Sequence, residues 1–464
     1  MRGRLRWCTG SFVIGSLVAC GGGGARSTGD ASAEGSESAS LTNASNTTTV
    51  GEESGSGSAS LSDGSSGMMS STVADTSASE SADEGIIFDV GASSDVGENP
   101  CGGKGKGGQP EFSYIWVCNS GEGTISKINT TTLVEEGRYQ TRPDTLGSPS
   151  RTSVNLSGDV AVANRLGGVT KLYALGDHCV DSNGMAGIQT STGKTDVLPW
   201  GVEECVAWHT PLPYSTNRPV AWAPGDFNPA TCTYENQMLW TAGGQNNVVD
   251  SLEVVRLNGD DGSIDATIPM PDVPIGYFGA YGGAVNQDGD FWFVVYDTFD
   301  VPETDLVRVD AVTLDYERFP VPAEICPYGF TVDSSGRPWI GSFCSQSARF
   351  TPGSDTWDLF PALGYGIQED AEGRMWLADY QLPGVREIDS DTLTLGAQIM
   401  LPASSPKGVS IDFEGFVWVV DMGSSAFKVN PDTMTWEVYN QLNGPYTYSD
   451  MTGWGLSNVT FPPG

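Results

Sequence analysis

A fifteen-residue pattern recurs along the second half of the chain and constrains its fold more than any other feature. In each copy a Gly stands second, another Gly follows seven residues later, and a Trp comes three residues after that. The four clear copies are residues 281–295, 328–342, 365–379 and 407–421, with a fainter copy at 150–164. A pattern that returns roughly every 40 residues predicts a repeating structural unit.

Each copy predicts a β-hairpin. A short alternating strand runs into a turn of the D-x-x-G type, and an apolar strand rich in Trp, Val and Ile follows. The turn Gly, such as Gly373, tolerates the positive φ that tight hairpins require. A second alternating stretch follows each hairpin, which makes four strands per unit. Four-stranded units of this length are typical of the blades of a β-propeller.

Counting the units predicts an all-β chain that forms a seven-bladed β-propeller. The blades are expected near residues 112–145, 148–200, 203–271, 279–322, 326–361, 363–402 and 405–440. The first blade has Trp116 at the repeat position but lacks a first strand. Residues 454–460 alternate like a strand, so we expect this C-terminal strand to complete the first blade and close the ring.

The N-terminal part of the chain has a different composition. Residues 1–20 have a basic start and a short apolar core, and they end in Leu-Val-Ala-Cys, which resembles a lipobox. Because the apolar run is too short to span a bilayer, we expect a lipoprotein signal peptide and lipidation of Cys20. The alternative is an ordinary cleaved signal peptide. Residues 21–98 contain almost no large apolar side chains and are expected to form a disordered tether, which leaves 99–464 for the propeller.

The charge of the chain limits its partners. It has 23 Lys and Arg against 58 Asp and Glu, a formal net charge of −35. Such acidity argues against nucleic acids and anionic membrane surfaces as partners. The lipid anchor at Cys20 predicts an exported protein at the outer membrane, at its periplasmic face or at the cell surface. We expect a monomer that binds a small molecule, a glycan, a peptide or an envelope protein.

The cysteines suggest disulfides, because an exported chain folds in a compartment that permits them. Two bridges are predicted, Cys326–Cys344 across the ends of one hairpin and Cys179–Cys205 around an insertion. Cys101 is a further candidate partner for Cys118, although sequence rarely determines connectivity.

The insertion in the second blade contains a partial calcium-loop pattern. Asp181 and Asn183 alternate like the first oxygen ligands of such a loop. Met185 stands where a third oxygen ligand is required, Ala186 stands where the turn Gly is required, and no Glu closes the loop. The alternatives are a metal site at Asp181 and Asn183, or an Asx-type turn within a stapled loop, and these departures favour the turn.

Two positions of the repeat are expected to face one mouth of the central channel. The residues before the repeat Gly are Ser150, Tyr281, Tyr328, Tyr365, Lys407 and Trp454. The residues three after the Trp are Asn119, Asn164, Val295, Ser342, Asp379 and Asp421. An aromatic rim with a few polar groups suits small-molecule, sugar or peptide binding. The predicted ligand-binding residues are Tyr281, Tyr328, Tyr365, Trp454, Asn119, Asn164 and Asp379. The alternative is that the tyrosines only pack between blades.

The repeat Gly-x-x-x-D-x-x-G-x-x-W, the seven blades and the C-terminal closure resemble the virginiamycin B lyase (streptogramin lyase) group and, more loosely, NHL-type propellers. The resemblance covers about residues 110–464. It implies a lyase in which two His and one Glu act with Mg²⁺ nearby. The matching positions in this chain are Tyr365, Lys407 and Asp421.

The substitution of both catalytic His argues against that activity. Unperturbed Tyr and Lys titrate near pH 10 and above, so they replace an imidazole base poorly. His178 and His209, the two histidines of the chain, lie in early blades. We therefore expect a non-catalytic binding mouth; the alternative is a lyase-like enzyme that uses Tyr365, Lys407 and Asp421. No cofactor is firmly predicted, and Mg²⁺ or Ca²⁺ are the candidates.

Overall fold

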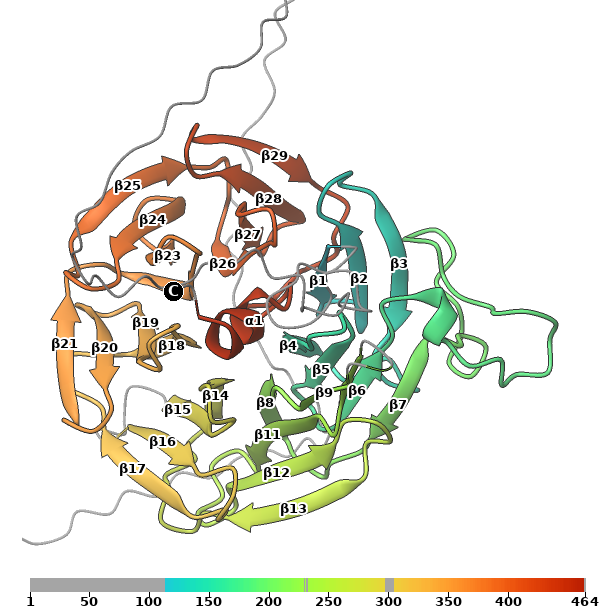
Figure 1. Cartoon of the computed structure of the whole chain (residues 1–464), viewed down its shortest axis with the longest axis horizontal. Helices are drawn as coiled ribbons and strands as arrows, with labels where there is room; N and C mark the ends of the chain where they lie inside the picture. Colours follow the sequence, from blue (N-terminus) through green and yellow to red (C-terminus); the bar gives the residue numbers. More distant parts are fainter. Residues whose placement is uncertain (1–112, 229, 231–232, 297–303, 463–464) are drawn as a thin grey trace, which may run out of the picture. The chain divides into compact units, whose positions relative to one another are not determined.

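The computed structural model describes residues 113–462, except 229, 231–232 and 297–303. Its seven main antiparallel sheets surround a central channel, so the predicted all-β, seven-bladed propeller is confirmed (Figure 1). The predicted signal peptide, Cys20 and the tether lie outside the described residues. Within the described part, no helix is both long and apolar enough to cross a membrane.

The strands of each blade follow one another from the channel outward. Blade 1 contains β1 (Tyr114–Asn119), β2 (Thr124–Asn129) and β3 (Glu135–Gln140). Blade 2 contains β4 (Pro149–Val154), β5 (Val160–Asn164), β6 (Val169–Leu172) and β7 (Val206–Thr210). Blade 3 contains β8 (Thr216–Trp222), β11 (Met238–Gly244), β12 (Glu253–Asn258) and β13 (Ile264–Pro269). A separate hairpin of β9 (Asp226–Asn228) and β10 (Thr233–Glu235) connects β8 to β11.

The other four blades have four consecutive strands each. Blade 4 contains β14 (Gly279–Val285), β15 (Phe291–Tyr296), β16 (Asp305–Val309) and β17 (Tyr316–Pro320). Blade 5 contains β18 (Pro327–Val332), β19 (Pro338–Ser342), β20 (Ser347–Thr351) and β21 (Thr356–Phe360). Blade 6 contains β22 (Gly364–Glu369), β23 (Arg374–Asp379), β24 (Gly384–Asp389) and β25 (Leu395–Met400). Blade 7 contains β26 (Pro406–Ile411), β27 (Val417–Asp421), β28 (Ser425–Asn430) and β29 (Thr435–Tyr439).

The border between blades 2 and 3 differs from the sequence prediction. The insertion after β6 contains the short 3-10 helix η1 (Gly176–His178), and the chain then returns to add β7 as the outer strand of blade 2. Residues 206–210 had been assigned to blade 3. The insertion separates two strands that pair with each other, and the apolar pattern does not reveal this pairing.

Two of the predicted disulfides are confirmed. Cys179 and Cys205 are bonded with Cα atoms 4.6 Å apart, which joins the two ends of the insertion. Cys326 and Cys344 are bonded with Cα atoms 5.4 Å apart, beside the paired ends of β18 and β19. The predicted pairing of Cys118 with Cys101 is wrong, because Cys118 is a buried free thiol.

The repeat Gly brings the inner strands of neighbouring blades into direct contact. A Cβ atom on Gly329 of β18 would lie 1.8 Å from the carbonyl oxygen of Tyr365 on β22. A Cβ on Gly366 would lie 2.7 Å from the carbonyl oxygen of Lys407, and one on Gly408 would lie 2.2 Å from that of Thr447. No side chain fits at these positions, so Gly is required where the backbones approach most closely.

The residue before the repeat Gly is displaced by a β-bulge. The pairing of β18 with β19 shifts between Pro327 and Gly329, which leaves Tyr328 without a partner in the ladder. The same shift occurs in the inner strands β4, β8, β14, β22 and β26. Because a bulge re-aims the extra side chain, each of these inner strands presents one residue at the same end of the channel.

The turn Asp of the repeat holds the repeat Trp in place. In blade 6 the Asp370 carboxylate accepts hydrogen bonds from the turn N–H groups of Glu372 and Arg374, and from the Trp376 indole at 2.7 Å. Blades 5 and 7 contain the same bond, from Trp339 to Asp333 and from Trp418 to Asp412. These indoles are fully buried, so the carboxylate satisfies a donor that would otherwise be costly to bury.

The ring is closed by a different C-terminal segment from the one predicted. The closing segment, residues 443–452, lies beside β1: the amide of Trp116 donates to Met451 O at 2.9 Å, and the amide of Tyr446 donates to Cys118 O at 3.2 Å. Asn119 also forms an isolated bridge with Pro445. C-terminal closure of blade 1 is therefore correct, but it uses residues that precede 454–460 and do not form a regular strand.

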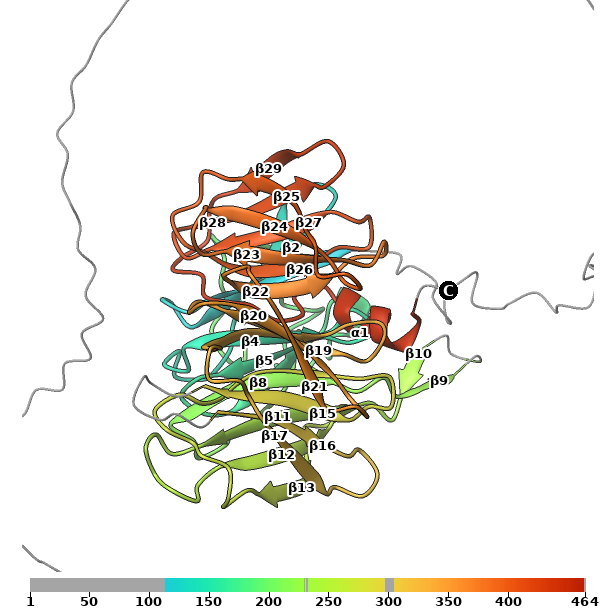
Figure 2. The same ribbon diagram turned by 90° about the vertical axis from the view of Figure 1, so that its left-hand side faces the viewer.

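Residues 454–460 form helix α1 (Trp454–Thr460) instead of the expected strand. The Asp450 carboxylate accepts hydrogen bonds from the amides of Gly453 and Leu456, which turns the chain into the helix. Leu456 and Val459, three residues apart, are buried, as one face of a helix would be. Figures 1 and 2 show α1 at one end of the central channel.

The close approach of Gly329 to the neighbouring backbone predicts that even a single added methyl group destabilises the protein. The Gly329→Ala substitution should lower the free energy of unfolding by about 3 kcal/mol, because the new methyl group overlaps a neighbouring backbone carbonyl. Urea unfolding measures the effect. The control Gly176→Ala has nothing within 4 Å of the added atom and should lose no stability. Equal stability of the two variants would contradict the close approach.

The closing segment predicts different results for two truncations. A chain that ends after Gly453 keeps every contact of residues 443–452 with β1 and should remain folded, with a lower Tm because α1 is lost. A chain that ends after Gly444 loses the closing hydrogen bonds and should not give a cooperative thermal transition. Circular dichroism melting separates the two outcomes. Loss of folding in both chains would mean that α1, not the closing segment, holds the ring together.

Candidate functional site

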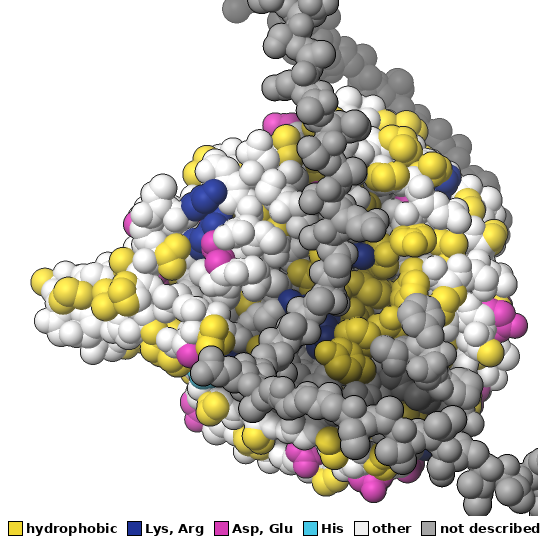
Figure 3. Space-filling view, turned by 180° about the vertical axis from the view of Figure 1, so that it is seen from behind, with side chains coloured by type: hydrophobic (Ala, Val, Ile, Leu, Met, Phe, Trp, Pro, Cys, Tyr) yellow, Lys and Arg dark blue, Asp and Glu magenta, His cyan; other side chains and the backbone are white. Residues whose placement is uncertain are grey.

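The end of the channel opposite α1 is filled by aromatic side chains. We call this cluster the tyrosine mouth; it consists of Tyr281, Tyr296, Tyr328, Tyr365, Tyr446, Tyr448, Phe278 and Phe343. The bulges of β14, β18 and β22 supply three of the tyrosines, and the closing segment supplies Tyr446 and Tyr448. In Figure 3, which views the face behind that of Figure 1, hydrophobic side chains and Lys or Arg gather around the centre of this face.

The hydroxyl groups of the tyrosine mouth converge. The Tyr446 hydroxyl lies 3.0 Å from that of Tyr281 and is also hydrogen-bonded to that of Tyr328. The ring centroids of Tyr328 and Tyr365 are 4.5 Å apart. Burial raises the pKa of Tyr281, Tyr328 and Tyr365 above the ordinary value for tyrosine. These phenols therefore remain protonated at neutral pH and serve as hydrogen-bond donors.

Cationic side chains lie against the tyrosine rings. The guanidinium carbon of Arg151 lies 3.3 Å from the ring centroid of Tyr448 and 4.8 Å from that of Tyr281. Arg218 lies 5.0 Å from Tyr281, and the Lys407 ammonium lies 3.3 Å from the ring centroid of Tyr365. Such distances allow cation–π attraction, so the mouth of this acidic chain is locally basic.

Arg151 is the most unusual of these cations. Its side chain is fully buried, and it donates from Nε to Tyr281 O and from Nη1 to Ser150 O. Its Nη2 and the Tyr448 hydroxyl are buried without a hydrogen-bond partner. Burial lowers the pKa of Arg151 to about 10, which still leaves it charged at neutral pH. The buried part of the tyrosine mouth thus contains the positive charge of Arg151, and two polar groups there, Arg151 Nη2 and the Tyr448 hydroxyl, make no hydrogen bond.

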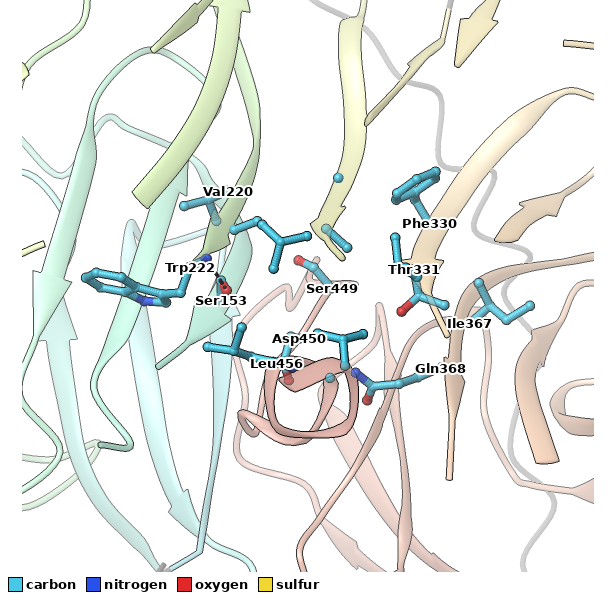
Figure 4. A pocket seen from close by; sticks show the side chains of 17 residues that line it. Ser153, Val220, Trp222, Phe330, Thr331, Ile367, Gln368, Ser449, Asp450 and Leu456 are labelled. Carbon is cyan, nitrogen blue, oxygen red and sulfur yellow. Dashed lines mark hydrogen bonds between the residues drawn. The ribbon is translucent and has the colours of Figure 1, made fainter. Parts of the chain in front are cut away.

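The opposite end of the channel is nearly closed by α1. Figure 4 shows Leu456 of α1, Gln368 of β22 and Trp222 of β8 around the remaining space. This cavity has a volume of about 30 Å³. In the same measure a water molecule needs roughly 10–15 Å³, so the cavity holds one or a few waters and not an organic ligand.

The structure brings together four of the predicted mouth residues and excludes one. Tyr281, Tyr328, Tyr365 and Lys407 lie at one end of the channel, where each contacts the next. Trp454 was predicted there, and that placement is wrong. It lies on α1 at the other end, where its indole donates to Glu369 O at 2.8 Å. The error follows from the assignment of 454–460 as a strand.

The predicted mouth residues that lie three positions after the repeat Trp mainly stabilise turns and strand ends. Asn119 and Asn164 are fully buried, and each is hydrogen-bonded to neighbouring Thr or Ser groups. The Asp379 carboxylate accepts hydrogen bonds from the amides of Gln381 and Leu382. These side chains stabilise the backbone around the mouth, and their role in ligand binding stays a prediction.

Tyr365, Lys407 and Asp421, which match the catalytic positions of the lyase group, do not all interact with one another. The Lys407 ammonium contacts the face of the Tyr365 ring. The Asp421 carboxylate accepts hydrogen bonds from the Ser404 hydroxyl, the Ser405 amide and the Gly423 amide. Tyr365 and Lys407 are therefore in contact, while Asp421 stabilises the segments before β26 and after β27.

The predicted metal loop contains a turn. The Asn183 side-chain oxygen accepts a hydrogen bond from the Met185 amide at 2.8 Å, which is the Asx-type turn that was the alternative. Asp181 is exposed, and Glu204 accepts from the amides of Ser182 and Asn183. In the described part of the chain, no group of three or more His, Cys, Asp or Glu side chains could hold a metal ion. This donor set does not support Ca²⁺ at Asp181 and Asn183.

Both histidines lie in blade 2. His178 ends η1 and packs edge-on against Tyr173. His209 lies in the outer strand β7, with its ring nitrogen 2.9 Å from the Thr170 hydroxyl. Neither belongs to the tyrosine mouth.

Sequence reasoning missed Arg151, Arg218, Tyr446 and Tyr448. The sequence does show Arg151 where the repeat has Gly, so the departure from the repeat was a signal. Arg218 occupies the bulge of β8, the position of Tyr328 in blade 5, but the third blade lacks a clear repeat. Tyr446 and Tyr448 could not be placed because closure was assigned to residues 454–460.

Comparisons with known proteins do not identify a family for this chain. No family model matches the chain, and no curated protein matches it. A streptogramin B lyase structure is 15% identical, with a TM-score of 0.48, over 68% of this chain and 88% of that one. A catalytically inactive virginiamycin B lyase from Staphylococcus aureus with quinupristin is 13% identical, with a TM-score of 0.42, over 63% of this chain and 83% of that one.

A third similar structure has a different description. It is a putative 6-phosphogluconolactonase from Bacteroides fragilis, 12% identical with a TM-score of 0.48, and the match covers 72% of this chain and 97% of that one. Identities this low carry no information on the chemistry of this chain. Streptogramin B lyase and other propellers are among the structural neighbours of this chain.

Proposed function

We propose that this chain is an exported, lipid-anchored propeller that binds a ligand at the tyrosine mouth without transforming it. The observation that supports the proposal best is the convergence of bulged residues from separate blades on one end of the channel. Buried Arg151 and Tyr448 retain unfilled hydrogen-bonding capacity there. Aromatic side chains with a few fixed polar groups are the usual lining of a small-molecule or peptide site.

The location is part of the same proposal. Cys20 would carry the lipid, and the tether would hold the propeller away from the membrane. The two disulfides support an oxidising compartment, because such bonds persist outside the cytoplasm. An envelope protein that docks on the mouth is an alternative to a small ligand or glycan.

The side chains of the tyrosine mouth are better suited to binding a ligand than to catalysing a reaction. A general base is most effective when its pKa lies near the working pH. Burial moves the pKa of Tyr365 further from neutrality. The second candidate is the lyase-like enzyme, and the contact between Lys407 and Tyr365 favours it. The described mouth has no cluster of acidic or His ligands that would fit Mg²⁺, so no step is assigned to a metal.

A thermal-shift screen of the full chain tests binding. Maltotriose, a short neutral peptide and a streptogramin are suitable probes. A ligand present at a hundred times its Kd should add roughly 2.7 kcal/mol of stability. The Tyr365→Leu variant should lose the shift, while Tyr316→Leu on the outer strand β17 should keep it. A shift that survives Tyr365→Leu would place the site elsewhere.

Turnover of a streptogramin tests the second candidate. We expect no linear product from the full chain with Mg²⁺, because no imidazole stands at the mouth. Mass spectrometry of the antibiotic detects cleavage directly. Cleavage that disappears in Lys407→Ala and remains in Lys194→Ala, an exposed control in the insertion, would contradict the non-catalytic proposal.

A further inference from the structure

We infer that the ligand of the tyrosine mouth carries an oxyanion, a carboxylate or a phosphate, attached to an apolar or aromatic body. This inference rests on the proposed binding function and names the chemical class of the ligand. It depends on three features of the mouth: an uncompensated buried guanidinium, a second guanidinium beside it, and tyrosine donors and faces around both.

The first feature is the charge of Arg151. In the described part of the chain, its hydrogen bonds go to two backbone carbonyls, and its Nη2 has no partner. No described carboxylate pairs with it. A buried charge without a counter-charge is strongly unfavourable. An oxyanion that reaches Nη2 would supply the missing partner, and guanidinium–carboxylate or guanidinium–phosphate pairs are among the strongest hydrogen-bonded contacts.

The second feature is Arg218. Arg151 from β4 and Arg218 from β8 lie 4.8 and 5.0 Å from the same Tyr281 ring. Repulsion from Arg218 contributes to the lowered pKa of Arg151, after the larger effect of burial. Two like charges against one ring favour a ligand of the opposite charge at that ring. Arg218 is also buried, so bulk solvent screens this interaction weakly.

The third feature is the arrangement of the tyrosines. The Tyr448 ring lies under the Arg151 guanidinium, and the Tyr448 hydroxyl is buried without a hydrogen-bond partner. Tyr446 is only half-buried, and its hydroxyl meets those of Tyr281 and Tyr328. These phenols can donate to an oxyanion, while the ring faces of Tyr446 and Tyr365 can pack against an apolar body.

The contrast with the rest of the chain strengthens the argument. The chain has a formal net charge of −35, so its overall charge disfavours anions. The mouth collects Arg151, Arg165, Arg218 and Lys407 at one end of the channel. A cleft lined by one sign of charge concentrates ligands of the opposite sign. An anionic ligand would thus be directed to this end of the channel.

Matched anionic and neutral probes test the inference on the full chain. Benzoate and phenyl phosphate should bind in calorimetry at low salt, while benzamide, the neutral analogue of benzoate, should bind at least tenfold more weakly. Inorganic phosphate shows whether the oxyanion alone suffices. Arg218→Gln should weaken benzoate or phenyl phosphate at least tenfold, and Arg151→Met should abolish their binding. Lys194→Gln, which removes one exposed charge, should change nothing.

The outcomes separate this inference from the proposed function. Equal binding of benzoate and benzamide, both lost in Tyr365→Leu, would keep a binding mouth and overturn the oxyanion. Binding of the anions that persists in Arg218→Gln would also overturn it, even if Arg151→Met fails to fold. If no charged or neutral probe binds, either in calorimetry or in the thermal-shift screen, neither the oxyanion inference nor the proposed binding function is supported.

Discussion

The close approach of neighbouring inner strands at the repeat Gly is the constraint on which the rest of the structure depends. At Gly329, Gly366 and Gly408 the next backbone lies where a side chain would begin. The residue before each of these Gly lies in a bulge at one end of its inner strand. The second strand of each of blades 5, 6 and 7 carries a buried Trp, which the turn Asp anchors through the indole N–H.

The same constraint explains why the mouth is a distinct chemical site. Side chains from different blades meet there because their strands cannot separate. Blade 2 departs from the repeat because Arg151 occupies the Gly position. The Arg151 side chain extends over the rings of Tyr448 and Tyr281. Blade 3 places Arg218 in its bulge. A regular repeat makes the propeller, and these two departures give one side of the channel mouth its positive charge.

The sequence contained enough information for the architecture and for part of the site. Periodic Gly and Trp predict the blades, and the ends of one hairpin predict the bridge between Cys326 and Cys344. The positions of Tyr328 and Tyr365 followed from the repeat alone. The closure could not be predicted in detail, because residues 443–452 pair through single hydrogen bonds and have no alternating pattern. Residues 454–460 have strand-like composition, yet the Asp450 cap and a buried Leu456 favour a helix.

The central claim is that the inner strands, which approach closely at the repeat Gly, form the tyrosine mouth. Buried Arg151 in this mouth binds an oxyanion of the ligand. A crystal structure of the full chain soaked with 4-bromobenzoate, with anomalous scattering from the bromine, tests this most directly. The account predicts a bromine peak over the rings of Tyr365 and Tyr446, with the carboxylate within hydrogen-bond distance of Arg151 Nη2. Bromine peaks only outside the channel, with Nη2 bonded to a carboxylate or carbonyl of the chain itself, would contradict it.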